Sequence, residues 1–159
     1  MRLLESRIMP NPRVAHCVFC DDIRLERGNK ISFMGVYTFD LATNVAFPVT
    51  LPKLAITVWV IADISDRPSK LEITVLLPDG KELLRAEVPD SSTPSYPDFM
   101  LGSAERVILT SSFSLVPVVL PCEGTLEVWI ETEREKLRAG RLWVHQIDMP
   151  EPTTQPSIA

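Results

Sequence analysis

The sequence predicts a single all-β domain, an antiparallel sandwich of two β-sheets. Apolar residues recur at every second position or in short runs, and not at the spacing of three and four that marks a helix. Fourteen prolines and only six glycines divide the chain into short segments. Roughly seven to nine of these segments have strand character and follow at regular spacing. We expect an immunoglobulin-like or other Greek-key connectivity, with a barrel as the alternative.

The first half of the chain contains three predicted strands. Residues 13–20 and 30–39 read as strands joined by a polar turn that includes Gly28 and Asn29. Residues 54–62, with the sequence LAITVWVIA, are β-branched and aromatic, as strands require. Because side chains alternate along a strand, four of these residues should face the interior: Leu54, Ile56, Val58 and Val60.

A hairpin follows at 70–77 and 82–88. Its first strand alternates cleanly, with Leu71, Ile73, Val75 and Leu77 expected inside and Glu72 and Thr74 outside. Pro78-Asp79-Gly80 supplies the turn, since glycine adopts the positive φ that other residues resist.

The second half repeats this pattern. Residues 106–116 read as a strand, and Pro117 and Pro121 bracket a short apolar piece, because proline is confined to strand ends and edges. Residues 125–132 and 139–148 complete the domain and are joined by the charged turn 133–136. Their inward residues should be Leu126, Val128, Ile130, Leu142 and Val144.

Three segments fall outside this pattern. We expect an N-terminal arm at 1–12, the sandwich domain at 13–148 and a flexible tail at 149–159, which is rich in proline and threonine. Residues 89–105 are too long for a tight connection, and loops of this length are usually functional or disordered.

Composition and charge exclude several classes of function. The net charge of −5 and the absence of a basic cluster argue against a nucleic-acid partner, which needs a concentrated positive surface. No apolar run is long enough to span a membrane, and Glu5 and Arg7 interrupt any signal peptide. Three cysteines, an odd number, favour free thiols. We therefore expect a cytoplasmic protein without a cofactor.

A series of short motifs begins at Cys20. It comprises Asp-Asp-Ile-Arg, a Glu two residues after the Arg, a Lys, a Gly-x-Tyr strand and Leu-Pro-Lys-Leu. In this pattern the chain resembles a family of uncharacterised bacterial proteins, over most of its length. The resemblance implies a bacterial, non-secreted domain of unknown function and supplies no activity. The matching positions are Asp21, Asp22, Ile23, Arg24, Glu26, Lys30, Gly35, Tyr37, Leu51, Pro52, Lys53 and Leu54.

Two groups of residues suggest metal chemistry. Cys17 and Cys20 form a C-x-x-C, but residues three apart on a strand point to opposite faces, so we predict small buried thiols and not a metal site. Acidic residues in two loops suggest a hard-cation site. The alternative is that each carboxylate caps a turn or pairs with an arginine. These residues are Asp21, Asp22, Glu26, Asp63 and Asp66.

No catalytic motif is present. There is no nucleophile elbow and no glycine-rich phosphate loop, and only His16 and His145 are available as histidine bases. Glycoside hydrolysis needs only two carboxylates, and Glu127 and Glu131 lie on one side of the same predicted strand. Outward glutamates on an exposed strand are ordinarily solubilising, so we predict no catalytic residue.

The tryptophans carry the main functional prediction. In each strand the assigned phase leaves the indole outside, which predicts Trp59, Trp129 and Trp143 on the surface opposite the core. An internal segment could cover them, namely the 89–105 loop or the N-terminal arm. They could instead bind a protein partner or a second copy, or form a platform for a carbohydrate. A bulge before Trp143 would reverse its face.

The sequence therefore favours a non-catalytic interaction or assembly module with an aromatic surface. The residues expected to form that surface are Trp59, Trp129, Trp143, Tyr96, Phe99 and Met100. The alternative is a binder of a small ligand, carbohydrate or cation, or a hydrolase, with its site in the loops 21–30, 63–69 and 89–105 at one end of the sandwich.

Overall fold

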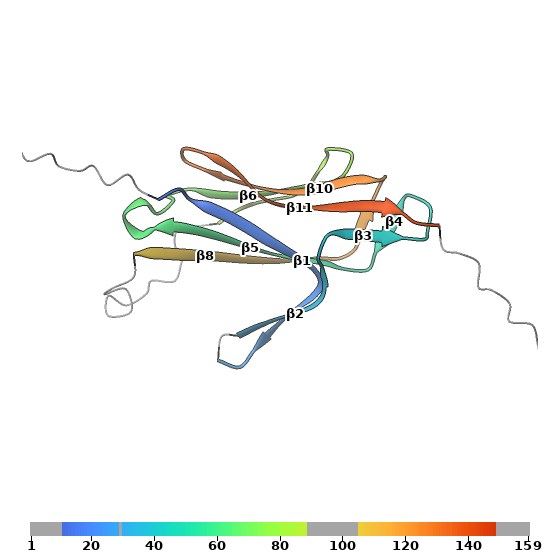
Figure 1. The fold of residues 1–159 in the computed structure, drawn as a ribbon, viewed down its shortest axis with the longest axis horizontal. Helices are drawn as coiled ribbons and strands as arrows, with labels where there is room; N and C mark the ends of the chain where they lie inside the picture. The colour runs from blue at the N-terminus through green and yellow to red at the C-terminus, as the bar shows by residue number, and fades with distance from the viewer. Residues whose placement is uncertain (1–10, 29, 89–104, 149–159) are drawn as a thin grey trace, which may run out of the picture.

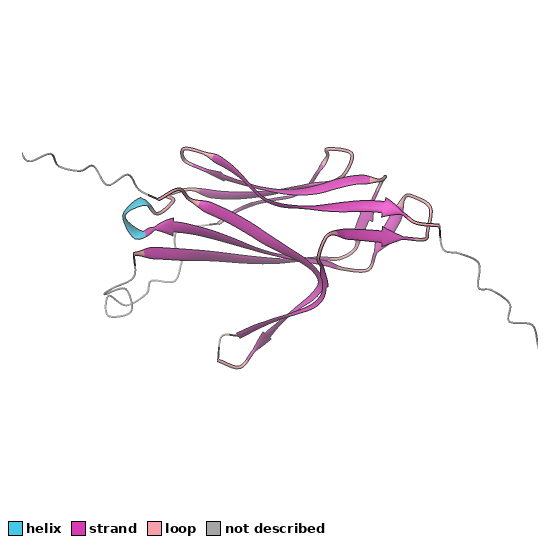
Figure 2. Ribbon diagram, in the orientation of Figure 1, coloured by secondary structure: helices cyan, strands magenta, loops and turns pink. Residues whose placement is uncertain are grey.

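A computed structural model of the chain describes residues 11–28, 30–88 and 105–148, which form eleven β-strands and one short 3-10 turn. The strands stack in two layers (Figures 1 and 2). Their bounds are β1 Val14–Glu26, β2 Lys30–Tyr37, β3 Asp40–Thr43, β4 Val49–Leu51, β5 Leu54–Asp63, β6 Leu71–Leu76, β7 Glu82–Glu87, β8 Arg106–Leu115, β9 Val118–Leu120, β10 Gly124–Thr132 and β11 Lys136–Gln146, with the 3-10 turn η1 at Ile64–Asp66.

The all-β sandwich is confirmed, and neither layer closes into a barrel among the described strands. The first sheet has the order β2-β1-β5-β8 and the second has the order β3-β11-β10-β6-β7, while β4 and β9 form a small separate pair. All pairs are antiparallel except β3 with β11. The neighbours β1-β5-β8 and β11-β10-β6-β7 follow the orders A-B-E and G-F-C-C′ of an immunoglobulin sandwich.

The core lies between the two sheets and comes from the residues that the alternation assigns to it. Leu54, Ile56, Val58 and Val60 of β5 are fully buried, and β6, β10 and β11 face them. The predicted phase is correct for each of these strands, because the alternating apolar residues form the face that packs against the opposite sheet. The facing residues include Leu71, Ile73, Val75, Leu126, Val128, Ile130, Leu142 and Val144.

The hairpin β1–β2 differs from the prediction. A turn was expected directly after Cys20, but β1 continues to Glu26 and pairs with β2 along that length. Gly35 has a φ of +64°, and a Cβ atom there would lie 2.0 Å from Asp21 Oδ2. Only glycine fits opposite Asp21. Figure 1 shows β1 bending, so that the far part of the hairpin turns away from the second sheet.

A β-bulge shapes β11. The register between β10 and β11 shifts by one residue after Val128, which inserts Ala139 on the β11 side. The bulge reverses the faces of the residues on its two sides. It also brings Gly140 against β1, where an added Cβ would lie 2.5 Å from Cys17 Sγ. Glycine here allows the two sheets to approach closely.

Three short strands, β3, β4 and β9, were not predicted from the sequence. The range 30–39 is not one strand, since β2 ends at Tyr37 and the chain crosses to the second sheet as β3. The short strands β4 and β9 pair beside the prolines that were expected only to delimit strands. Among the described residues, no helix is long and apolar enough to cross a membrane.

Candidate functional site

The three tryptophans face outward from their sheets, as the alternation predicts, but they do not share a surface. Trp59 lies on β5 in the first sheet, whereas Trp129 and Trp143 lie on β10 and β11 in the second sheet. Since the outer faces of a sandwich point in opposite directions, Trp59 cannot join the other two. The sequence specified a face for each tryptophan but not which of the two layers each strand enters.

Trp59 is partly covered by its own chain. Its ring stacks on His16 of β1, with centroids 5.0 Å apart and planes 17° from parallel. Phe33 of β2 meets it edge-on at 5.7 Å. These aromatic contacts add to simple burial, so Trp59 anchors the bent β1–β2 hairpin against the first sheet.

Trp129 is embedded in charged side chains. Lys136 and Arg138 lie over its ring at 5.2 and 5.7 Å, and its Nε1–H donates to Glu127 at 2.9 Å. Arg138 also pairs with Glu127 at 3.5 Å. Cation–π contacts and a satisfied indole N–H account for this tryptophan without a partner. Glu127 is likewise engaged and not poised with Glu131 as a carboxylate pair.

Trp143 borders an open cleft in the outer face of the second sheet. The cleft has a volume of about 560 Å³. Phe39, in the connection between β2 and β3, is 85% exposed, and Trp143 of β11 is 49% exposed. We call this depression the aromatic cleft, and its lining residues are Thr38, Phe39, Thr125, Arg141 and Trp143.

Arg141 supplies the charge of the aromatic cleft. It stands directly across from Glu127 in the β10–β11 register, yet Glu127 bonds to Trp129 and Arg138 instead. Within the described residues, no carboxylate lies within ion-pair distance of Arg141. A guanidinium in a cleft with two exposed aromatic rings is suited to bind a carboxylate that carries an apolar group.

A histidine–carboxylate pair lies beside the cleft. His145 Nε2 is 2.6 Å from Asp40 Oδ2, and the His145 ring stacks loosely on Trp143, with centroids 6.4 Å apart. The pair joins the parallel strands β3 and β11. The pair therefore supports Trp143, which lines the cleft.

Sequence analysis missed most of this site. Phe39 and Arg141 were each assigned to a strand, 30–39 and 139–148, and the alternation contains no sign that they meet. Phe39 lies two residues after the end of β2, where the chain leaves one sheet for the other, so its position depends on a crossover that periodicity does not report. Of the other residues predicted for the aromatic surface, Tyr96, Phe99 and Met100 lie outside the described residues.

The five candidate cation ligands do not form one cluster. Asp22 pairs with Lys53, just before β5 begins, whereas Asp63 ends β5 and pairs with Arg106. The hydrogen bond from Lys53 lowers the pKa of Asp22, and hydrogen bonds from Asn11, together with the charge of Arg106, lower the pKa of Asp63. Asp21 accepts from the Tyr37 hydroxyl and Glu26 from Ser32. The loops 21–30 and 63–69 therefore do not build a common site. No group of three or more metal-ligating side chains occurs among the described residues.

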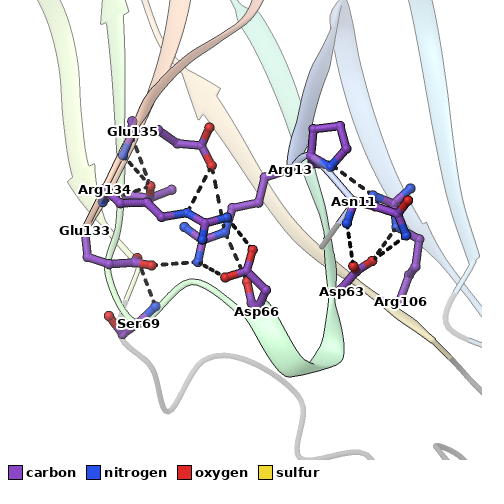
Figure 3. Close-up of polar contacts among 11 residues, drawn as sticks. Asn11, Arg13, Asp63, Asp66, Ser69, Arg106, Glu133, Arg134 and Glu135 are labelled. Carbon is purple, nitrogen blue, oxygen red and sulfur yellow. Dashed lines mark hydrogen bonds and ion pairs between the residues drawn. The ribbon is translucent and has the colours of Figure 1, made fainter. Parts of the chain in front are cut away.

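Asp66 belongs to a different structure, shown in Figure 3. The side chain of Arg13 is 1% exposed and contacts Asp66, Glu133 and Glu135. Its Nη2 donates to Glu133 at 2.6 Å, and its Nε donates to the Asp66 carbonyl at 3.1 Å. We call these four residues the Arg13 cluster. It ties the start of β1 to the β10–β11 turn and is structural.

The cysteines lie apart from the aromatic cleft. Cys17 and Cys20 pair with Val58 and Ala55 in the β1–β5 register, which places them on opposite faces of the first sheet, as predicted. All three cysteines are free. Burial raises the pKa of Cys17 to about 12 and also raises that of Cys20, which keeps both in the unreactive thiol form.

Comparison with known proteins agrees with the resemblance carried by the Cys20–Leu54 motifs. No curated protein and no solved structure matches the chain. One family model does match, and it spans residues 16–145, from the His16 that stacks on Trp59 to the His145 beside the cleft. The chain belongs to that family, DUF6941, a family of unknown function.

Proposed function

We propose that this protein is a non-catalytic interaction module that binds a protein partner in the aromatic cleft. The observation that carries the proposal is the exposure of Phe39 and Trp143 in the same cleft as Arg141. Tryptophan and arginine are the residues in which interfaces concentrate binding energy. Trp59 and Trp129, in contrast, already have internal partners.

The charge of the cleft suggests the chemistry of the partner. Arg141 can form a bidentate pair with a carboxylate, and Thr38 and Thr125 offer hydroxyl donors beside it. The two aromatic rings favour an apolar side chain next to that carboxylate. A segment that combines an acidic residue with an aromatic or aliphatic one fits these groups.

Site-specific photo-crosslinking tests the proposal. Phe39 is replaced by the photoreactive benzoyl-phenylalanine, and the protein is irradiated in host cells. We expect a discrete protein adduct, which the additional change Arg141→Glu should abolish. The matched control places the same group at Thr50, an exposed position of β4. Equal adducts at both positions, or none at Phe39, would show that the cleft does not bind a protein.

A second candidate function is supported by the volume of the cleft, which lies in the range of small-molecule sites. In that reading the ligand is an aromatic or sugar carboxylate that stacks on Trp143 and pairs with Arg141. Such a ligand raises the melting temperature by mass action. A thermal-shift panel of carboxylates, with Trp143→Ala as the control, distinguishes it from a protein partner.

We also propose a cytoplasmic location in a bacterium. The three free cysteines support the location, because secreted domains usually form disulfides. The resemblance of the Cys20–Leu54 motifs to uncharacterised bacterial proteins supports the bacterial source.

A further inference from the structure

Among the described strands, the edge of β8 that faces away from β5 differs from the other edges of the sandwich. β8 spans ten residues and pairs with β5 on one side, and no described strand pairs with its other side. β8 corresponds to strand E of an immunoglobulin sandwich, and in that fold a further strand, D, pairs with the outer edge of strand E. The geometry of this edge therefore suits an extended strand.

The register shows which backbone groups face outward. The N–H of Ile64 donates to the carbonyl of Glu105 at 3.0 Å, and the β5–β8 register continues from there without a shift. Hydrogen-bonded and non-hydrogen-bonded pairs alternate along antiparallel strands. The even-numbered residues of β8 therefore direct their N–H and C=O groups away from β5. Those with uncharged side chains are Ile108, Thr110, Ser112 and Ser114.

The other edges carry features that discourage pairing. β7 has charged residues at three of its six positions, Glu82, Arg85 and Glu87, and β3 is only four residues long. β2 contains Gly35, whose positive φ interrupts regular extended backbone. Proteins use charges and short or irregular strands to protect sheet edges. β8 has none of these beyond Arg106 at its start.

The side chains beside the β8 edge are also compatible with a second copy. Every outward residue of β8 after Arg106 is uncharged, and Ile108 is 50% exposed. An antiparallel strand pair is symmetric about a two-fold axis, so β8 can pair with itself. In such a pair the even-numbered residues of the two copies lie opposite each other. The hydroxyl side chains of Thr110, Ser112 and Ser114 then lie opposite one another or opposite Ile108. No acidic side chain enters the pair, although each chain carries a net charge of −5.

We propose that β8 pairs antiparallel with β8 of a second copy of this chain, forming a two-fold dimer with a continuous sheet. The dimer uses an edge of the first sheet, whereas the aromatic cleft lies on the second sheet. The two proposals are therefore independent, and each copy keeps its cleft open.

Sedimentation of the full chain over a wide concentration range tests the dimer. Thr110→Pro removes an outward N–H without removing a bond to β5, and proline is tolerated on a strand edge of this kind. Thr110→Lys places like charges close to the two-fold axis. We expect a wild-type dimer and a dissociation constant at least about tenfold weaker in both variants. Thr50→Lys, at an exposed position of β4, should remain dimeric.

Each outcome bears on the proposal. A wild-type chain that stays monomeric overturns it, and so does a dimer that persists in both Thr110 variants. Circular dichroism shows whether the Thr110→Pro variant folds. If that variant does not fold, sedimentation of the Thr110→Lys variant alone tests the dimer. Trp143→Ala serves as the converse control, because it should leave the dimer intact while it disturbs the cleft.

Discussion

The two outer faces of the sandwich are built from different chemistry. On the first sheet, the four rows from Val14 to Cys20 cross β1, β5 and β8 without a charged residue. On the second sheet, Glu127 and Glu131 of β10 stand opposite Arg141 and Lys136 of β11, and the row of Trp129 carries Arg138 and Arg85. Each face contains a tryptophan near its middle. Trp59 is held by His16 and Phe33, whereas Trp129 is held by Lys136 and Arg138.

The comparison of Trp59 with Trp129 shows that an outward tryptophan is not in itself a binding residue. Both indoles leave the core, yet each finds partners suited to its face, aromatic on one and cationic on the other. Only at the β3 side of the second sheet does an indole lack such cover, and there Phe39 and Arg141 join Trp143. Exposure of several hot-spot residues together is the more informative signal.

The largest loss of stability is expected at Arg13, a buried charged residue at the start of β1 in the first sheet. Replacing Arg13 with Ala leaves three carboxylates around a buried space, and we expect a loss of about 3 kcal/mol of unfolding free energy. Urea denaturation measures it. Arg134→Ala is the control, because Arg134 also pairs with Asp66 but its side chain is 45% exposed. Its loss should stay below about 1 kcal/mol.

A pair of tryptophan substitutions sharpens the comparison of the faces. Trp59→Ala should cost about 2–3 kcal/mol, because it removes packing against Phe33 and His16. Trp129→Ala should cost about 1 kcal/mol, since cation–π contacts at a surface are weaker. High salt should reduce the cost for Trp129 only. If the two variants lose equal unfolding free energy, or if salt affects both losses equally, the two tryptophans are not held by different kinds of contact.

The smallest effect concerns pH. The Arg13 guanidinium, which donates to Glu133, lowers the pKa of that carboxyl from 4.5 to about 2. Because the folded pKa lies below the unfolded one, the contribution of Glu133 is complete above about pH 4.5 and is lost as the pH falls towards 2. Unfolding free energies at about pH 6 and about pH 3 measure this loss. In Glu133→Gln the decrease should be smaller, and an unchanged decrease would assign it to other carboxylates.

Much of the fold follows from local pattern. The inward residues of β5, β6, β10 and β11 were predicted because period-two alternation reports the two faces of a strand directly. The bulge at Ala139 left the prediction for Trp143 intact, since the phase there was taken from Leu142 and Val144 after the bulge. The divergence of Cys17 and Cys20 followed from the same geometry.

The candidate site was less accessible to sequence analysis. Phe39 and Arg141 are a hundred residues apart in the chain, and they meet because β3 crosses to the second sheet and pairs in parallel with β11. The acidic residues show the opposite case, in which a cluster suggested by composition is distributed over β1, β5 and η1, and Lys53 and Arg106 pair with two of its members. Pairing between distant segments depends on tertiary packing, which periodicity does not encode.

The amino-acid sequence alone specifies an all-β sandwich and the side of each strand that faces the core. Burial of that side places apolar residues at every second position. Only the tertiary structure decided which layer each strand enters, and so which outward residues become neighbours. Strand order depends on contacts between segments far apart in the chain. Those contacts separate Trp59 from Trp129 and bring Phe39, Arg141 and Trp143 together.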